Sequence, residues 1–401
     1  MVLTTRRTLL GAAAAGLVLP RVARAENAPG VTDNEVLFGQ TMPYSGPASS
    51  YGTIGRAEAA YFKKINAEGG IHGRKLNFVS LDDGYIPPRT VELTRRLVEQ
   101  DKVAFIYGPL GTPTNNATRK YLNDKKIPTL FLATGATQFG DREHFPWTIG
   151  WQPTYQVEGH IYAKHVLATV PDAKVALLYQ NDDSGRDYVK GFRDVLGDKA
   201  DKMIVTTQSY EVTDPSIDSQ IVAMKESGAD TIFITGIPKF VAFGIRKVFD
   251  IGWRPRLFMV SSTGSSVATG IIPAGPEKAV GVVTTTYLKD PTDPQWASDK
   301  AFQDWLAWMK KYYADGDLRD VNNVYGYCSA QTMVQTLQQC GSDLSRENIM
   351  KQAANLDLDL PMLQPGIKVS TTPSNYYPLK QMRMVRFDGK GWVPFGDAIT
   401  G

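Results

Sequence analysis

Short apolar runs rich in β-branched and aromatic residues alternate with amphipathic stretches along most of this chain, and this alternation constrains the fold more than any other feature. The first series predicts helices at about 51–67, 88–101 and 114–125, which separate strands at Val36–Thr41, Leu76–Leu81, Val103–Tyr107 and Thr129–Leu132. Strands that alternate with helices are typical of βα units around a mostly parallel sheet. We therefore predict an α/β fold with a doubly wound parallel sheet.

A second series of the same kind follows Trp147–Trp151. It predicts helices at 154–168, 185–196, 216–227 and 238–250, and strands at Lys174–Tyr179, Met203–Ser209, Thr231–Thr235, Leu257–Val260 and near Val280–Thr286. A second set of strands implies a second sheet, and a chain of 401 residues is long enough for two units of roughly 100–200 residues each. The predicted architecture is therefore two doubly wound lobes.

The last part of the chain breaks this alternation. After a turn-rich connector, Asp290–Pro294, helices are predicted at about 296–313, 321–340 and 345–354 without strands between them, and they are expected to cover the first lobe. Met382–Phe387 and Trp392–Phe395 are then predicted to form a β-hairpin. Cys328 and Cys340 fall on one predicted helix about 18 Å apart, too far for a disulfide, so both are expected in the core.

The first 25 residues have the pattern of an export signal. Arg6 and Arg7 precede an apolar stretch from Leu9 to Leu19, and Ala23-Arg24-Ala25 offers a cleavage site after Ala25. The paired arginines resemble a twin-arginine signal, with a general secretory signal as the alternative. The apolar stretch is shorter than the ~20 residues that a spanning helix needs. We expect a mature chain of 376 residues (401 − 25) in the periplasm of a bacterium.

Charge and motif content exclude several classes of protein. The 44 Lys and Arg residues nearly balance 41 Asp and Glu residues and form no basic stripe, so a nucleic-acid partner is not expected. The sequence lacks the nucleophile-elbow, phosphate-loop, zinc-protease and dinucleotide motifs, and its four His residues are not spaced as a metal pair. No enzyme, cofactor or metal is therefore expected. Asp82-Asp83 and Asp182-Asp183 are interpreted as turn or helix-capping residues, and an enzyme that uses one of these pairs is the alternative from a different class.

Three loops are candidates for a ligand-binding cleft. In parallel sheets, ligands lie beyond the carboxyl ends of the strands, where loops lead into helix N-termini. The segments Met42–Pro47, Gly108–Thr114 and Ala133–Thr137 occupy this position and combine Gly, Ser and Thr, a composition that ordinary turns also favour. Their recurrence in successive units favours a cleft. Several aromatic residues near loops or helix starts could line an apolar pocket there: Tyr44, Tyr51, Tyr85, Trp151 and Tyr155.

Four strings in order along the chain carry a resemblance to a known family. They are Leu37–Gly46 (LFGQTMPYSG), Asn66–Lys75 (NAEGGIHGRK), Val103–Pro109 (VAFIYGP) and Gly228–Asp230 (GAD). Together they resemble the leucine/isoleucine/valine-binding type of periplasmic solute-binding protein, the receptors of branched-chain-amino-acid-type ABC transporters. The resemblance implies a type I periplasmic-binding fold in which three crossovers join two hinged lobes. The expected limits are 26–150 plus 287–366 for the first lobe and 151–286 plus 367–401 for the second.

The resemblance also implies site residues. In amino-acid binders of the family, the loop after the third strand holds the ligand carboxylate, and the next loop offers a carbonyl and a Thr. A Tyr at the start of the second lobe often stacks on the ligand. Mapped onto this sequence, and with the neighbouring loops included, the candidate ligand-binding residues are Tyr44, Leu110, Gly111, Thr112, Ala133, Thr134, Gly135, Thr137, Tyr155, Ser184 and Ser262.

One departure from the family pattern bears on the ligand. The acid that usually pairs with the ligand ammonium is missing from the loop Ser261-Ser262-Thr263, and a buried ammonium without a carboxylate is poorly compensated. This favours a small apolar or aromatic carboxylate, such as an aromatic acid or a 2-oxo acid. Asp183 or Asp214 could supply the missing charge, so a branched-chain amino acid stays open. The expected partners are the ligand and the permease of an ABC transporter, with a sensor subunit as the alternative, and the protein is expected to be a monomer.

Overall fold

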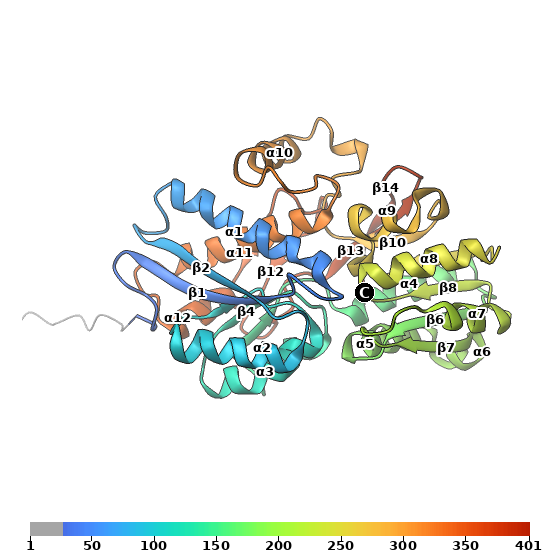
Figure 1. The fold of residues 1–401 in the computed structure, drawn as a ribbon, viewed down its shortest axis with the longest axis horizontal. Helices are drawn as coiled ribbons and strands as arrows, with labels where there is room; N and C mark the ends of the chain where they lie inside the picture. The colour runs from blue at the N-terminus through green and yellow to red at the C-terminus, as the bar shows by residue number, and fades with distance from the viewer. Residues whose placement is uncertain (1–26) are drawn as a thin grey trace, which may run out of the picture.

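The computed structural model describes residues 27–401, so the predicted export signal lies outside the described residues. Two lobes, each built around its own sheet, lie side by side along the long axis of the molecule (Figure 1). Within residues 27–401, no helix has the length and apolar character that crossing a membrane requires. The two-lobed α/β architecture predicted from the sequence is confirmed.

The first lobe contains a five-stranded parallel sheet in the order β2-β1-β3-β4-β5. The strands are β1 (Glu35–Met42), β2 (Lys75–Asp82), β3 (Ile106–Tyr107), β4 (Thr129–Leu132) and β5 (Thr148–Gly150). Its helices are α1 (Gly52–Ala67), α2 (Pro87–Arg95), α3 (Thr112–Asp124), α10 (Lys300–Tyr312), α11 (Val321–Cys340) and α12 (Arg346–Ala353). Helices α2 and α3 pack together on one side of the sheet, and α1 packs on α11 on the other side (Figure 1).

The second lobe contains a seven-stranded mixed sheet in the order β14-β13-β10-β9-β8-β6-β7. The parallel strands are β6 (Val175–Gln180), β7 (Ile204–Tyr210), β8 (Thr231–Ile234), β9 (Leu257–Val260) and β10 (Val283–Thr286). The predicted C-terminal hairpin, β13 (Gln381–Phe387) and β14 (Trp392–Thr400), adds to β10 in antiparallel fashion. The main helices are α4 (Tyr155–Thr169), α5 (Asp183–Leu196), α7 (Asp218–Glu226) and α8 (Pro238–Asp250).

The chain passes between the two sheets three times. The first passage follows β5, the second follows β10, and the third leads into β13. Residues 367–380, which the sequence assigned to the second lobe, lie beside the first, because β12 (Val369–Ser370) pairs with β11 (Asp357–Leu358) and the Tyr377 hydroxyl donates to the Thr137 carbonyl. The last passage therefore falls close to residue 380 rather than residue 366.

Local sequence signals explain where the helices around the interlobe boundary begin. The Thr154 hydroxyl accepts from the Val157 amide at the start of α4, and the Asp182 carboxylate accepts from the Ser184 and Gly185 amides at the start of α5. Asp320 caps α11 in the same way. Such caps satisfy amides that have no partner within the helix and fix the residue at which it begins. Cys328 and Cys340 are buried on α11 as free thiols, as expected.

Candidate ligand-binding site

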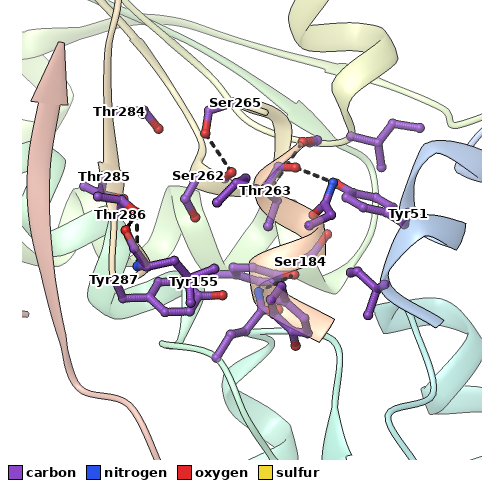
Figure 2. A pocket seen from close by; sticks show the side chains of 18 of the residues that line it. Tyr51, Tyr155, Ser184, Ser262, Thr263, Ser265, Thr284, Thr285, Thr286 and Tyr287 are labelled. Carbon is purple, nitrogen blue, oxygen red and sulfur yellow. Dashed lines mark hydrogen bonds between the residues drawn. The ribbon is translucent and has the colours of Figure 1, made fainter. Parts of the chain in front are cut away.

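A cavity lies between the two lobes and is lined by residues from both (Figure 2). It leaves about 100 Å³ for the centres of water-sized molecules, which is room for several waters or one small organic molecule. Six of the eleven residues predicted from the sequence line it: Leu110, Gly111, Thr112, Tyr155, Ser184 and Ser262. The lining residues, all from the described part of the chain, include no Lys, Arg, His or Cys.

The first-lobe wall is formed by the loop between β3 and α3. Gly111 has φ +101°, a conformation that favours glycine, and a Cβ there would collide with the Tyr85 ring, which also lines the cavity. Thr112 is the first residue of α3, and its hydroxyl lies 2.6 Å from the Thr134 hydroxyl. The free amides at the start of this helix favour a negatively charged group. This wall can therefore hold a carboxylate.

The second-lobe wall combines aromatic rings with Ser and Thr side chains. The Tyr155 ring stacks on Tyr188 with centroids 4.6 Å apart and an interplanar angle of 24°, and both rings line the cavity. Burial raises the pKa of Tyr155 to about 12, so its hydroxyl keeps its proton at neutral pH. Trp392 of the C-terminal hairpin also lines the cavity and donates from Nε1 to the Ser265 carbonyl at 2.8 Å. A flat apolar ligand body would be well packed against such a wall.

A buried carboxylate stands behind the second-lobe wall. Glu158 of α4 is 2% exposed, and its Oε1 accepts from the Ser262 amide at 2.7 Å and from the Thr285 hydroxyl at 3.0 Å. Its Oε2 accepts from the Tyr188 hydroxyl at 2.7 Å and from the Ser262 hydroxyl at 2.9 Å. Burial raises the pKa of Glu158, and these hydrogen bonds oppose that shift. Sequence reasoning missed Glu158, because nothing distinguishes it from an exposed helical acid.

The other five predicted residues do not line this cavity. Tyr44 is turned away from it, because its hydroxyl lies 2.7 Å from the Ser80 hydroxyl. Thr134 lies behind Thr112, and Gly135 accepts the Tyr155 amide at 2.8 Å, so these two support the wall from behind. Ala133 is buried in the core, and the Thr137 amide donates to the Asp187 carboxylate at 2.6 Å. The loop Ala133–Thr137 therefore lies one layer further from the cavity than the resemblance implied.

Of the acidic residues near the boundary between the lobes, Asp82 and Asp182 have structural roles, and Asp290 lines the cavity. The Asp82 carboxylate accepts from the Tyr44, Ser45 and Gly84 amides, and Asp182 caps α5, so both act as turn or capping residues. Asp183 and Asp214, which could have replaced the missing acid, do not line the cavity. Asp290, from the connector after β10, does line it. Burial raises the pKa of Asp290 to about 6, and hydrogen bonds from Thr292 lower it in part.

Three buried polar groups on the cavity wall have no hydrogen-bond partner among residues 27–401: Gln180 Oε1, Asn322 Nδ2 and the Tyr325 hydroxyl. A buried polar group without a partner costs free energy, so these groups are placed to bond a ligand or ordered water. Sequence reasoning missed all three. Asn322 and Tyr325 belong to α11, which reaches the cavity only through the second passage between the lobes.

Hydrogen bonds between the lobes close the cavity. The Tyr51 hydroxyl donates to the Thr263 carbonyl at 2.9 Å, a bond drawn in Figure 2. The Ser266 hydroxyl donates to Asp320 at 2.8 Å, and Asn116 Nδ2 donates to Asp183 at 2.7 Å. Each of these bonds joins a residue of the first lobe to a residue of the second, so the bonds require the lobes to be close together. A ligand that contacts both walls would stabilise this closed arrangement by its additional contacts.

Two α/β lobes joined by three passages of the chain, with a largely apolar cavity between them, define the class of type I periplasmic binding proteins. The chain belongs to the periplasmic binding protein family, whose model matches residues 35–391. Members of this family bind small molecules for transporters and are not enzymes, in agreement with the expectation from the sequence. The resemblance to leucine/isoleucine/valine-binding proteins is likewise confirmed.

Two relatives illustrate the similarity in sequence. The chain is 22% identical over 321 residues to a Pseudomonas aeruginosa protein named amino acid binding protein. The alignment covers 77% of this chain and 80% of that protein. It is 21% identical over 404 residues to Leu/Ile/Val-binding protein homolog 7 of Brucella abortus, and this alignment covers 96% of this chain and 97% of that protein.

Two solved structures show the same fold. A branched-chain amino acid ABC transporter protein from Thermus thermophilus with bound valine aligns with a TM-score of 0.81 at 18% identity, covering 92% of this chain and 98% of that chain. The fatty acid ABC transporter substrate-binding protein from Thermomonospora curvata aligns with a TM-score of 0.78 at 21% identity, with 94% and 95% covered. At these identities the likeness shows the fold and leaves the ligand to be argued from the site.

Proposed function

We propose that this protein is the extracytoplasmic substrate-binding protein of an ABC importer and that it captures a small apolar or aromatic carboxylate between its lobes. The observation that carries the proposal is the cavity itself. It combines the amide and hydroxyl of Thr112 at the start of α3 on one side with the stacked rings of Tyr155 and Tyr188 on the other. Thr112 suits a carboxylate, and the two rings suit an apolar or aromatic body.

The size of the cavity favours a small ligand. About 100 Å³ is open to the centres of water-sized molecules, and the lobe–lobe hydrogen bonds close the space around it. A long acyl chain would need a larger or more open space. The ligand that we propose is therefore in the size range of an aromatic acid or an amino acid.

A branched-chain or other hydrophobic amino acid is the second candidate. Asp290 favours it, because this buried carboxylate lines the cavity and could pair with an ammonium group. The names of the relatives point the same way, since one is named amino acid binding protein and another Leu/Ile/Val-binding protein homolog 7. Asp290 was not among the acids considered from the sequence, so the argument against an amino acid is weaker than the missing acid near Ser262 suggested.

A binding screen tests the proposal. The purified mature protein is heated with organic acids and amino acids in turn, because a ligand that binds only the folded state raises the melting temperature. Calorimetry with leucine, 4-hydroxybenzoate and phenylpyruvate then separates the two candidates. Tight binding of leucine alone would overturn the preference for a neutral-bodied acid, and no stabilisation by any acid would overturn the carboxylate receptor.

The export and delivery steps belong to the same proposal. Arg6 and Arg7 are proposed to direct export before cleavage near Ala25, and the closed form is proposed to dock on the membrane permease as a monomer. Cell fractionation of the wild type and of an Arg6→Lys/Arg7→Lys variant tests the route. Retention of the variant in the cytoplasm supports twin-arginine export, and unchanged export points to the general secretory route.

A further inference from the structure

Three hydroxyl groups on the second-lobe wall share one buried acceptor. The side chains of Ser262, Thr285 and Tyr188 line the cavity, and each places its hydroxyl within 3.0 Å of a Glu158 carboxylate oxygen. Figure 2 shows Ser262 and Thr285 side by side on this wall. Neither the Ser262 hydroxyl nor the Tyr188 hydroxyl has another hydrogen-bond partner among residues 27–401.

The number of protons decides what these hydroxyls can offer to a ligand. A hydroxyl has one proton and two lone pairs, and an ionised carboxylate can only accept. When each of the three protons points at Glu158, only lone pairs remain for the cavity. The wall then accepts hydrogen bonds and cannot donate them.

The surroundings of Glu158 favour this arrangement. Besides the three hydroxyls, the Ser262 backbone amide donates to Oε1 at 2.7 Å. The Tyr162 hydroxyl lies 3.0 Å from the same oxygen but 2.6 Å from the Val260 carbonyl, which can only accept, so its one proton is not counted for Glu158. The backbone amide can only donate, so Oε1 must act as an acceptor. Four donors, the three hydroxyls and this amide, thus reach the carboxylate and compensate for its burial.

We propose that Glu158 is a positioning residue that determines ligand specificity, by turning Ser262, Thr285 and Tyr188 into a wall of acceptors. This inference deepens the proposed function and rests on it. The ligand then carries a hydrogen-bond donor, an ammonium or a hydroxyl group, at the end of its body that meets this wall. A 2-oxo acid presents only a carbonyl oxygen there, so its lone pairs would face those of the wall.

Matched ligands of one carbon skeleton test the inference on the wild-type protein. One series is leucine, 2-hydroxy-4-methylpentanoate and 4-methyl-2-oxopentanoate, and the second is phenylalanine, 3-phenyllactate and phenylpyruvate. The third pair is 4-hydroxybenzoate and benzoate. Calorimetry is expected to show at least tenfold tighter binding of the donor-bearing member in the series that fits the cavity.

The variant Glu158→Gln tests the role of the carboxylate. The side-chain amide donates where Oε2 accepted, so the hydroxyls of Ser262 and Tyr188 are free to turn their protons into the cavity. The preference for the donor-bearing ligand is expected to fall at least tenfold. Should this variant fail to fold, Thr285→Val removes one acceptor of the wall and is expected to reduce the same preference several-fold.

Glu58→Gln is the matched control. Glu58 of α1 is equally buried and accepts from Gln40 Nε2 at 2.6 Å and from the Tyr107 hydroxyl at 3.0 Å, but none of these three residues lines the cavity. A loss of ligand preference caused by general destabilisation would appear in both glutamine variants. We expect it in Glu158→Gln alone.

The outcomes separate the inference from the function. Equal or tighter binding of the oxo acids to the wild type, or an unchanged preference in Glu158→Gln, would overturn the acceptor wall and leave the carboxylate receptor standing. Failure of every one of these acids to bind would overturn the proposed function, and the inference would fall with it.

Discussion

Replacing Asp290 by Asn is expected to stabilise the unliganded protein at neutral pH. Asp290 is 6% exposed, and its burial raises the carboxyl pKa from 3.8 to about 6. The folded state therefore binds a proton more tightly than the unfolded chain, and the stability that this contributes below pH 3.8 is lost as the pH rises to about 6. Two pKa units correspond to about 3 kcal/mol. Asparagine has no charge to bury and keeps an oxygen that can accept from Thr292.

Urea unfolding at two pH values measures this effect. At pH 4.5 the Asp290 carboxyl is already mostly ionised in the unfolded chain. Roughly 1 kcal/mol of the roughly 3 kcal/mol of stabilisation is therefore lost at that pH. The gain from Asp290→Asn is therefore expected to be about 2 kcal/mol larger at pH 7.5 than at pH 4.5. An equal effect at both pH values would refute the assignment of a raised pKa. If the ligand is an amino acid, the same variant should bind it more weakly, because its ammonium loses the buried partner.

Three further changes test other parts of the site. Thr112→Ala is expected to weaken carboxylate binding by roughly 1–3 kcal/mol, because a buried charged acceptor loses a donor, and unchanged affinity in calorimetry would remove Thr112 from the site. Tyr155→Ala should weaken aromatic ligands more than small aliphatic ones, since it removes stacking area, and equal losses would assign Tyr155 to packing alone. Asp183→Ala removes the acceptor of the Asn116 bond between the lobes. Because the Asp183 side chain is 45% exposed, the closed form should lose roughly 0.5–1 kcal/mol, seen as a two- to fivefold higher Kd, and an unchanged Kd would show that the bond does not favour closure.

Most of the fold follows from sequence periodicity. Strands such as β4 and β9 were predicted at their observed limits, because each is a short apolar run between clear turn signals. β5 was missed, because three residues are too few to show an alternating pattern. β3 is shorter than the predicted run Val103–Tyr107, in which only Ile106 and Tyr107 form the strand.

The site was predicted less completely than the fold. Local signals identified the loop around Gly111 and Thr112, because strand, glycine turn and helix start follow one another directly there. Asp290 and Asn322 reach the cavity only because the chain passes between the sheets, and no local pattern shows where such a passage ends. Tyr44 was wrongly predicted to bind the ligand. Its loop was placed correctly, but its hydroxyl bonds with the Ser80 hydroxyl instead of facing the cavity.

The pairing of β13 with β10 ties ligand capture to the final stretch of the polypeptide. Trp392 lies in the strand after β13, yet it forms part of the wall around the cavity. A polypeptide that ended before Gln381 would leave β10 as an open sheet edge and would lack Trp392 in the cavity wall. The first lobe could then form while the protein remained unable to bind its ligand. Ligand capture would therefore become possible only after these last strands have paired with β10.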